Sequence, residues 1–176
     1  MGSERRELST NEPAAWLIQN LDLLPAAGEA LDVACGRGRN ALALARAGLR
    51  VRAVDRDEAA LAGLRAEARG LPIAVEAVDL ETGEADLGRE AFDVIAVFHY
   101  LHRPLFPALL RALRPGGLLI YETFIVDQAA RGRPTNPLFL LQRGELKRLV
   151  APLDILRDRE GEFDGAMVAG VAARRP

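Results

Sequence analysis

The sequence predicts an α/β fold with a doubly wound, mostly parallel sheet and an antiparallel hairpin at its C-terminal end. Short apolar segments alternate with helical segments through most of the chain, which is typical of βαβ units. A turn containing Gly36 and Gly38 joins the first apolar segment to a helical one. The last two apolar segments are joined through Gly161 to Gly165 with no helix between them, so they predict the hairpin.

Two segments precede the glycine turn, and we expect the first to be loose and the second to be helical. Residues 1–12 are polar, and we expect a loose N-terminus there. Apolar side chains recur at helical spacing in residues 13–24, which predicts a helix lying on the fold. Trp16 and Leu17 in this helix could close over a pocket as a lid. An apolar stripe of this kind is more often part of the core, and we favour that reading.

The remaining chain divides into strands, helices and connections. Segments with the apolar character of strands are 31–34, 50–54, 73–77, 92–98, 118–124, 154–159 and 166–173. Segments with helical character are 40–47, 57–68, 105–113 and 145–150, with glycine or proline after the first three. Residues 81–90 and 127–137 lack either period and predict connections. The apolar run after Asp93 is typical of a central strand covered on both faces.

The composition narrows the class of protein. With 176 residues, of which 49% are hydrophobic and 27% charged, the chain is expected to form a single globular domain over residues 1–176. A net charge of -2 gives no reason to expect a nucleic-acid partner. One cysteine, Cys35, and two histidines argue against a structural zinc site, so no metal is predicted. No stretch reaches the roughly 20 apolar residues of a membrane span, and the charged start is unlike a secretory signal. We therefore expect a cytoplasmic protein with no membrane partner.

The glycine turn has the composition of a cofactor site. Glycines let backbone amides approach a ligand closely, and the free N–H groups at a helix start favour anionic or polar groups. Gly36, Gly38 and Ala41 satisfy the dinucleotide-binding pattern GxGxx(G/A). Ligands of open α/β sheets lie beyond the carboxyl ends of the strands. Three acids are expected at that edge: Asp32, Asp55 and Asp79.

In this arrangement the chain resembles the class I S-adenosylmethionine-dependent methyltransferases. Their first motif has an acid, three residues and then GxG, as in Asp32 to Gly38, and their next motifs supply acids at successive strand ends. The RPGG of residues 114–117, before an apolar strand, is also typical of that superfamily. The resemblance implies a seven-stranded Rossmann-like sheet, S-adenosylmethionine as cofactor and S-adenosylhomocysteine as product.

A closer likeness runs from about Asp32 to the C-terminus. RNALALARAG after the glycine turn, VDL at residues 78–80 and FLLQRGELKRLV at residues 139–150 resemble the small tellurite-resistance-type methyltransferases. This likeness implies a small-molecule methyl acceptor, with a thiol, a selenium compound or a tellurium compound as candidates. It leaves a monomer or a homodimer equally open.

The superfamily resemblance assigns roles to the acids. It implies that Asp55 accepts two hydrogen bonds from a ribose diol, that Asp79 meets the adenine amino group with Leu80 on the ring, and that Asp32 holds the methionine end. The alternatives are a turn or cap aspartate for Asp55, a solvated loop acid for Asp79 and a helix cap for Asn40. The residues expected around the cofactor are Asp32, Ala34, Cys35, Gly36, Gly38, Asn40, Asp55, Arg56, Asp79, Leu80 and Phe98. Cys35 also fits a small packing residue.

Methyl transfer itself needs few catalytic groups. A lone pair of the acceptor must be held near the methyl carbon in a pocket sheltered from water, and soft acceptors need no strong base. Three catalytic candidates stand after the fourth strand or in the fifth: His99, Tyr100 and Glu122. The alternatives are a purely structural role for His99 and an ion pair between Glu122 and an arginine across the sheet. Further candidates near the methyl group are His102, Tyr121 and Thr123. An oxyanion acceptor could be received by Arg131, Arg133 and Arg143, although we favour solvated loop residues as the reading of these arginines.

Two other function classes remain compatible with the motif. GxGxxA and Asp55 also fit a nicotinamide-dinucleotide-binding oxidoreductase, although the chain shows neither a substrate domain nor a recognisable catalytic pair. A non-catalytic S-adenosylmethionine-binding sensor would keep the fold and the cofactor without transferring a methyl group.

Overall fold

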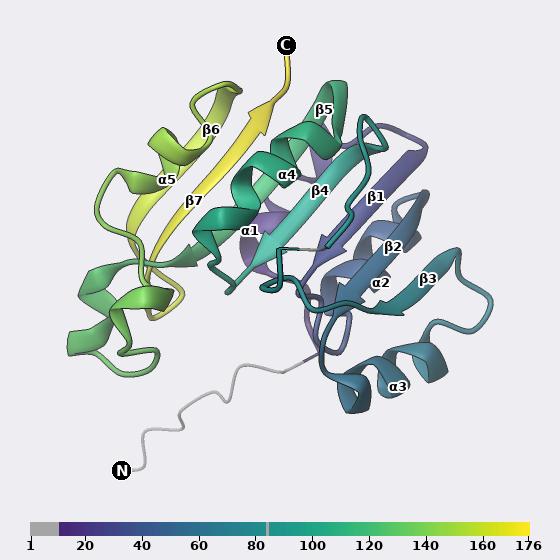
Figure 1. Cartoon of the computed structure of the whole chain (residues 1–176), viewed down its shortest axis with the longest axis horizontal. Helices are drawn as coiled ribbons and strands as arrows, with labels where there is room; N and C mark the ends of the chain where they lie inside the picture. Colours follow the sequence, from purple (N-terminus) through teal and green to yellow (C-terminus); the bar gives the residue numbers. More distant parts are fainter. Residues whose placement is uncertain (1–10, 84) are drawn as a thin grey trace.

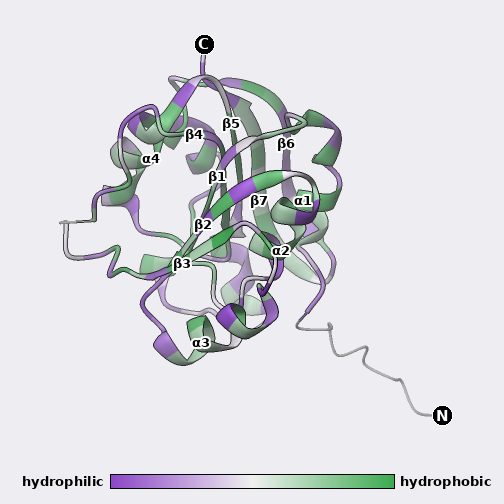
Figure 2. Cartoon of the chain, turned by 90° about the vertical axis from the view of Figure 1, so that its right-hand side faces the viewer, coloured by the Kyte–Doolittle hydropathy of each residue, from purple (hydrophilic) through white to green (hydrophobic). Residues whose placement is uncertain are grey.

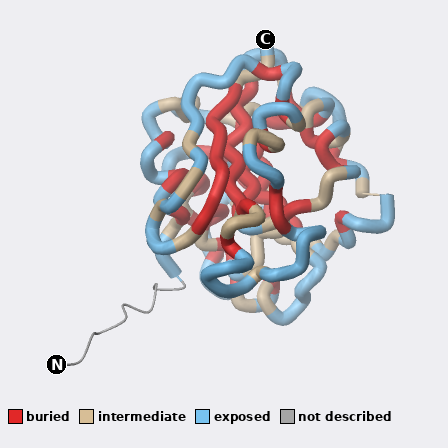
Figure 3. The backbone as a smooth tube through the Cα atoms, turned by 90° about the vertical axis from the view of Figure 1, so that its left-hand side faces the viewer, coloured by how far each residue is buried: buried red, intermediate tan, exposed pale blue. Residues whose placement is uncertain are grey.

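The computed structural model describes residues 11–83 and 85–176, so most of the expected loose N-terminus, residues 1–10, lies outside the described residues. Its centre is a seven-stranded sheet in the order β3-β2-β1-β4-β5-β7-β6 (Figure 1). The strands are β1 (Gly28–Val33), β2 (Leu49–Asp55), β3 (Ile73–Ala77), β4 (Phe92–Phe98), β5 (Leu113–Phe124), β6 (Asp154–Phe163) and β7 (Ala166–Arg174). The middle of the sheet is buried (Figure 3).

The directions of the strands confirm the predicted fold class. β3, β2, β1, β4 and β5 pair in parallel, whereas β7 is antiparallel to both β5 and β6. The hairpin turn consists of Asp164 and Gly165, both with positive φ, as in the tight turns that match the twist of two antiparallel strands. Because β7 lies between β5 and β6, the strand that runs antiparallel to β5 is not at the edge of the sheet; β6 is. Both hairpin strands are longer than expected.

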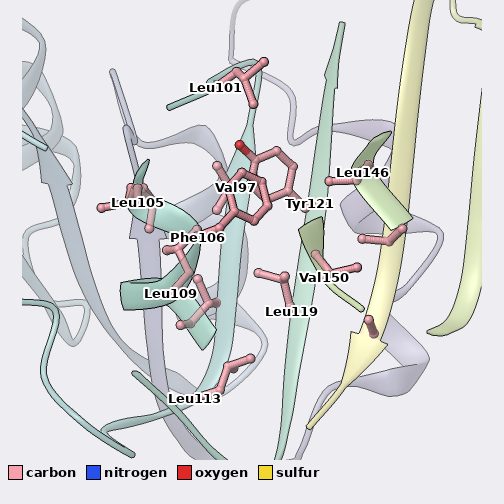
Figure 4. Packing of buried hydrophobic residues seen from close by; sticks show 14 of the residues in the cluster. Val97, Leu101, Leu105, Phe106, Leu109, Leu113, Leu119, Tyr121, Leu146 and Val150 are labelled. Carbon is pink, nitrogen blue, oxygen red and sulfur yellow. The ribbon is translucent and has the colours of Figure 1, made fainter. Parts of the chain in front are cut away.

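Helices cover both faces of the sheet. They are α1 (Ala15–Ile18), α2 (Arg39–Arg46), α3 (Glu58–Glu67), α4 (Phe106–Ala112) and α5 (Glu145–Leu149). Side chains of α1, α2 and α3 belong to the core cluster on one face. Side chains of α4 and α5 pack on the other face, where Phe106 and Leu146 lie near Tyr121 of β5 (Figure 4). α3 carries both hydrophobic and hydrophilic residues, and only Leu61 and Leu64 are buried (Figure 2).

The N-terminal helix is shorter than expected. It ends at Ile18, and a separate 3-10 helix, η1 (Leu21–Leu23), follows. The buried Asn20 side chain donates a hydrogen bond of 2.7 Å to the carbonyl oxygen of Trp16, and such local side-chain bonds compete with a continuing helix. Trp16 and Leu17 are buried, which agrees with the core reading.

Other boundaries also differ from the predictions; β1, for example, begins at Gly28 and not at Leu31. α4 is preceded by the 3-10 helix η2 (Arg103–Leu105) and ends at Ala112. β5 begins at Leu113 and not at Leu118, because Leu113 already pairs with Phe92 before the register shifts. The segment expected to be an irregular connection at 127–137 includes parts of two 3-10 helices, η3 (Val126–Ala130) and η4 (Pro137–Phe139). In the described part of the chain, every helix is too short or too polar to cross a bilayer.

Candidate functional site

Three pockets adjoin at the carboxyl ends of the parallel strands. The first, of about 150 Å³, is lined by Ala34, Asp55, Arg56, Val78, Asp79, Leu80, Glu81 and Tyr100. The second, of about 290 Å³, is lined by Asp32, Ala34, Cys35, Gly36, Arg37, Arg39, Asn40, Phe98 and His99. The third, of about 330 Å³, is lined by Glu12, Pro13, Ala14, Ala15, Arg39, His99, Glu122, Phe124, Phe163, Asp164, Ala166 and Val168. Because the first two share Ala34, and the last two share Arg39 and His99, the pockets are neighbours along this edge of the sheet.

The turn after β1 forms the wall between the first two pockets. Gly36 donates its backbone N–H to Oδ2 of Asp55 at 2.8 Å, which ties the turn to the end of β2. Gly38 begins α2 with a φ of 78°, and a Cβ on it would lie 2.3 Å from Cδ1 of Leu64 in α3. Gly38 is therefore required both by the backbone conformation and by the close packing of α3.

Replacing Gly38 with Ala is expected to lower the free energy of unfolding by about 1–2 kcal/mol, because the new methyl group meets Leu64 and the positive φ is strained. Urea unfolding measures the change. Gly63→Ala is the matched control: a Cβ at this position in α3 meets no atom within 4 Å, so alanine should stabilise the helix. Equal changes for the two variants would contradict the packing argument.

Asp55 and Asp79 both stabilise turns at the first pocket. Oδ1 of Asp55 accepts the backbone N–H of Asp57 at 2.9 Å, in addition to the bond from Gly36 to Oδ2. Oδ1 of Asp79 accepts the backbone N–H of Glu81 at 3.0 Å. A carboxylate oxygen can accept a second hydrogen bond, so these turn contacts leave both side chains able to bind a ligand in the pocket that they line.

Asp32 is the most unusual acid of the site. It lies in β1 opposite Ala53 of β2 and Ala96 of β4, and the small size of these neighbours leaves it space. Only 2% of its surface is exposed, and its Oδ2 atom has no hydrogen-bonding partner among the described residues. Burial raises the pKa of Asp32 from 3.8 to about 7, although the backbone of Ala41 and the charge of Arg39 act in the opposite direction. A buried carboxylate oxygen without a partner is costly, which favours a ligand that donates to it.

Asn40 and Cys35 complete the second pocket. The helix-cap alternative for Asn40 is wrong, because Gly38 occupies the N-cap of α2 and no side chain caps it. Oδ1 of Asn40 instead accepts the backbone N–H of Ala14 at 2.9 Å, so it fixes the N-terminal segment against α2. Burial raises the pKa of the Cys35 thiol, which keeps it neutral and unreactive.

His99 stands at the boundary of the second and third pockets. It follows β4 with a φ of 53°, and its ring stacks on Phe124 with the centroids 4.7 Å apart. Burial and the nearby Arg39 lower the pKa of His99 to about 4. The imidazole is therefore neutral at pH 7, and it is a weak base.

Glu122 forms a buried ion pair in the wall of the third pocket. Its Oε2 atom accepts a hydrogen bond of 2.6 Å from Nε of Arg159, and the two side chains are only 6% and 7% exposed. Burial raises the pKa of Glu122, and Arg159 counteracts this rise. The arginine partner across the sheet, considered as an alternative from the sequence, is thus present, while Glu122 still lines the pocket.

Arg159 contacts two aromatic rings with its guanidinium group. The sequence did not identify this residue as the partner of Glu122. Its guanidinium lies 4.7 Å from the ring centroid of Trp16 and 4.4 Å from that of Phe163. Glu122 and Arg159 are both in register with Gly170 of β7, so the pair meets across a residue without a side chain. A lone glutamate in an apolar strand signals a buried cation, but it does not say which arginine supplies it.

Several expected residues lie away from the third pocket. Tyr100 lines the first pocket, where its hydroxyl is buried without a partner among the described residues, and burial raises its pKa to about 12. Tyr100 therefore lies at a different pocket from the one that His99 and Glu122 line, and its catalytic role stays a prediction. Tyr121 and Thr123 are buried in the sheet. Arg131 and Arg143 form exposed ion pairs with Glu162 and Asp127, respectively, as the solvated reading expects. Within 11–83 and 85–176, no group of three or more His, Cys, Asp or Glu side chains could hold a metal ion.

The chain is similar to known methyltransferases and to other curated proteins. The sequence model of a family described as "Methyltransferase domain" matches residues 30–117. Hemagglutinin 1 of Eikenella corrodens is 30% identical over 154 residues, which is 83% of this chain and 50% of that protein. A probable S-adenosylmethionine-dependent methyltransferase of Mycolicibacterium smegmatis is 30% identical over 159 residues, which is 83% of this chain and 59% of that protein. The chain thus spans little more than half the length of these relatives.

Solved structures share the fold. An S-adenosylmethionine-dependent methyltransferase from Mesorhizobium loti superposes with a TM-score of 0.73 at 21% identity, covering 92% of this chain and 99% of that one. TehB from Haemophilus influenzae superposes with a TM-score of 0.77 at 20% identity, covering 93% of this chain and 63% of that one.

Proposed function

The chain belongs to the family of class I, S-adenosylmethionine-dependent methyltransferase domains, and from this premise we propose that it transfers a methyl group from S-adenosylmethionine to a small-molecule acceptor. The observation that carries the proposal is the buried Asp32 carboxylate, whose Oδ2 atom lacks a partner in the described chain and which lines the second pocket. A ligand with a donor group would satisfy this atom. The cofactor offers such a group in its α-ammonium.

The first two pockets fit the two ends of the cofactor. In the proposed site, Asp55 binds the ribose diol and Asp79 and Leu80 contact the adenine in the first pocket. Asp32 accepts from the α-ammonium in the second pocket, and Arg37 and Arg39 are the cations available there for the α-carboxylate. S-Adenosylmethionine supplies a methyl group on a sulfonium, which is already activated for displacement.

The third pocket is proposed to hold the acceptor. It meets the second pocket at His99 and Arg39, so an acceptor there can face the methionine end of the cofactor. Tyr100 is assigned to the cofactor side, while His99 and Glu122 remain the residues proposed to contact the acceptor. A sulfur, selenium or tellurium acceptor agrees with a neutral histidine of pKa about 4, because soft atoms need no strong base. The proposed location is the cytoplasm, with a monomer or a homodimer as the functional unit.

Titration calorimetry and thermal unfolding test the cofactor. S-Adenosylmethionine and S-adenosylhomocysteine are each expected to release or absorb heat on binding and to raise the melting temperature, since a ligand at 100 times its Kd stabilises the folded state by about 2.7 kcal/mol. Absence of both effects would remove the proposal. A change in NADH fluorescence when the protein is added would support the oxidoreductase alternative. Transfer of a labelled methyl group to an acceptor distinguishes an enzyme from a non-catalytic sensor.

Cofactor affinity is expected to rise about tenfold between pH 6 and pH 8, since Asp32 must lose its proton to pair with an ammonium group. The pKa of Asp32 lies above its ordinary value, so the folded protein without cofactor holds this proton more tightly than the unfolded chain. Its stability therefore falls as the pH rises from about 4 to 7, and cofactor binding at pH 7 releases about half a proton per molecule. Calorimetry in buffers of different ionisation enthalpy measures the release. A release that persists in Asp32→Asn would refute the assignment.

A further inference from the structure

The third pocket combines an apolar wall with carboxylates. One part of its apolar lining comes from β5 and the β6–β7 hairpin, namely Phe124, Phe163, Ala166 and Val168, and the other part comes from residues 13–15. Its carboxylates are Glu12, Glu122 and Asp164, and its cation is Arg39 at the boundary with the second pocket. If Arg39 pairs with the carboxylate of the cofactor, the three carboxylates around the acceptor still outnumber Arg159, the cation that pairs with Glu122.

Glu122 keeps one oxygen available to the pocket. Arg159 binds Oε2, whereas Oε1 has no hydrogen-bonding partner among residues 11–83 and 85–176. The residue is only 5% exposed and still lines the pocket, so its carboxylate belongs to the wall of the pocket and not to the outer surface. Asp164 adds a second carboxylate, whose Oδ2 atom lies 3.8 Å from Nη2 of Arg159.

The pocket offers little help to an acceptor that must lose a proton. His99 is neutral and weakly basic, because burial and Arg39 lower its pKa, and Arg159, which binds Oε2 of Glu122, opposes protonation of that carboxylate. An oxyanion acceptor would also have to approach carboxylates, which repel it. Both features favour an acceptor that enters without charge and leaves with a positive charge.

We propose that the acceptor is a small uncharged molecule whose nucleophilic atom carries a lone pair and no proton, such as a thioether, a selenide or an aza-aromatic. This inference rests on the proposed methyl transfer. The lone pair of the acceptor forms the new bond to the methyl carbon, while the bond between that carbon and the cofactor sulfur breaks and its electron pair stays on that sulfur. The positive charge passes from the sulfur to the methylated acceptor, and no proton is released.

The lining stabilises this movement of charge. As the new bond forms, positive charge develops on the acceptor in the third pocket, where Glu122 and Asp164 supply negative potential. The apolar wall of Phe124, Phe163 and Val168 binds the uncharged body of the acceptor. The same carboxylates give no such benefit to a thiolate, whose methylated product is neutral.

The test uses the full chain, saturating methyl-labelled S-adenosylmethionine and six acceptors. Dimethyl selenide, dimethyl sulfide and pyridine represent uncharged acceptors without a proton, ethanethiol represents thiols, and selenite and tellurite represent oxyanions. We expect labelled permanent cations from the first three, formed at least about tenfold faster at pH 7 than any other labelled product. Their rates should be constant from pH 6 to 9, since no proton leaves.

Asp164→Asn tests the charge without disturbing the fold. Asp164 is 59% exposed and has a φ of 53°, which asparagine also tolerates. We expect a roughly two- to fivefold lower rate with dimethyl selenide and no lower rate with ethanethiol. Calorimetry should also show that trimethylsulfonium binds to this variant more weakly than to the parent by a similar factor, when both proteins are saturated with S-adenosylhomocysteine. Asp154→Asn, the same exchange at the other end of β6, is the control and should change neither quantity.

The outcomes separate the inference from the proposed function. Label on ethanethiol or an oxyanion, with none on the uncharged acceptors, would overturn the inference and leave methyl transfer standing. Cofactor binding with no labelled acceptor would also overturn it. Failure of the cofactor to bind at all would instead remove the proposed function. An equal loss in Asp164→Asn and Asp154→Asn would show that the charge at the pocket has no particular effect, which likewise contradicts the inference.

Discussion

Replacing Arg159 with Met is expected to lower the free energy of unfolding by about 3–5 kcal/mol, because it leaves the buried Glu122 carboxylate without its cation. Methionine is long enough to fill the space between Trp16 and Phe163, so the loss reports mainly the unpaired charge. Urea unfolding at pH 7.5 measures it. The loss should shrink as the pH falls, since an unpaired Glu122 can then take up a proton.

A double-mutant cycle distinguishes the charge from the packing. Arg159→Met combined with Glu122→Leu removes both charges, and its stability should return to within about 1–2 kcal/mol of the parent. Arg157→Met is the control on the same strand, because Arg157 pairs with Asp22 at the surface and its loss should have a much smaller effect. If the double variant is as unstable as the single one, packing of the guanidinium and not its charge stabilises this region.

Replacing Asp55 with Ala is expected to weaken S-adenosylmethionine binding by about 1.5–3 kcal/mol, the range for hydrogen bonds to a charged group, or roughly 10- to 150-fold in Kd. Asp55 lines the first pocket and also accepts the backbone N–H groups of Gly36 and Asp57. The substitution therefore removes the proposed ribose contact and loosens the glycine turn. Calorimetry gives the affinity, and urea unfolding should reveal an additional loss of about 1 kcal/mol in stability.

Two variants serve as controls for Asp55. Asp55→Asn keeps the size and one acceptor oxygen, so it should lose less affinity than Asp55→Ala. Asp57 caps α3 by accepting from the backbone N–H groups of Ala59 and Ala60. Asp57→Ala should lower stability by about 1 kcal/mol without changing cofactor affinity. Unchanged affinity in Asp55→Ala would mean that the nucleoside does not bind in the first pocket.

Local patterns in the sequence predicted most elements of the fold. Residues 73–77 and 92–98 form β3 and β4 with the expected bounds, because alternating or continuous apolar character is set by the residues of the strand itself. The same patterns failed at Asn20, where a side-chain hydrogen bond to Trp16 ends α1 early. They also failed at Leu113, which pairs with Phe92 before the glycine pair and so begins β5.

The candidate site, like the fold, could be predicted from the sequence only in part. Strand order and direction bring Asp32, Asp55 and Asp79 to the edge where we expected them, since parallel strands share one carboxyl edge. Arg159 and Arg39 could not be singled out, because the chain has 23 basic residues and only Lys147 is a lysine. Tyr100 follows His99 directly, yet the two side chains line different pockets, and adjacency in sequence does not reveal this.

The sequence by itself determined the α/β class, the glycine turn and the acids at the strand ends, because these depend on short-range periodicity and on a topological rule. Only the tertiary structure decided that Glu122 meets Arg159 across Gly170, that residues 12–15 form a wall of the third pocket, and that Asp32 is buried with an unsatisfied oxygen. The reason is physical. Burial and ion pairing depend on which distant segments the folded sheet places side by side, and no local pattern encodes that placement.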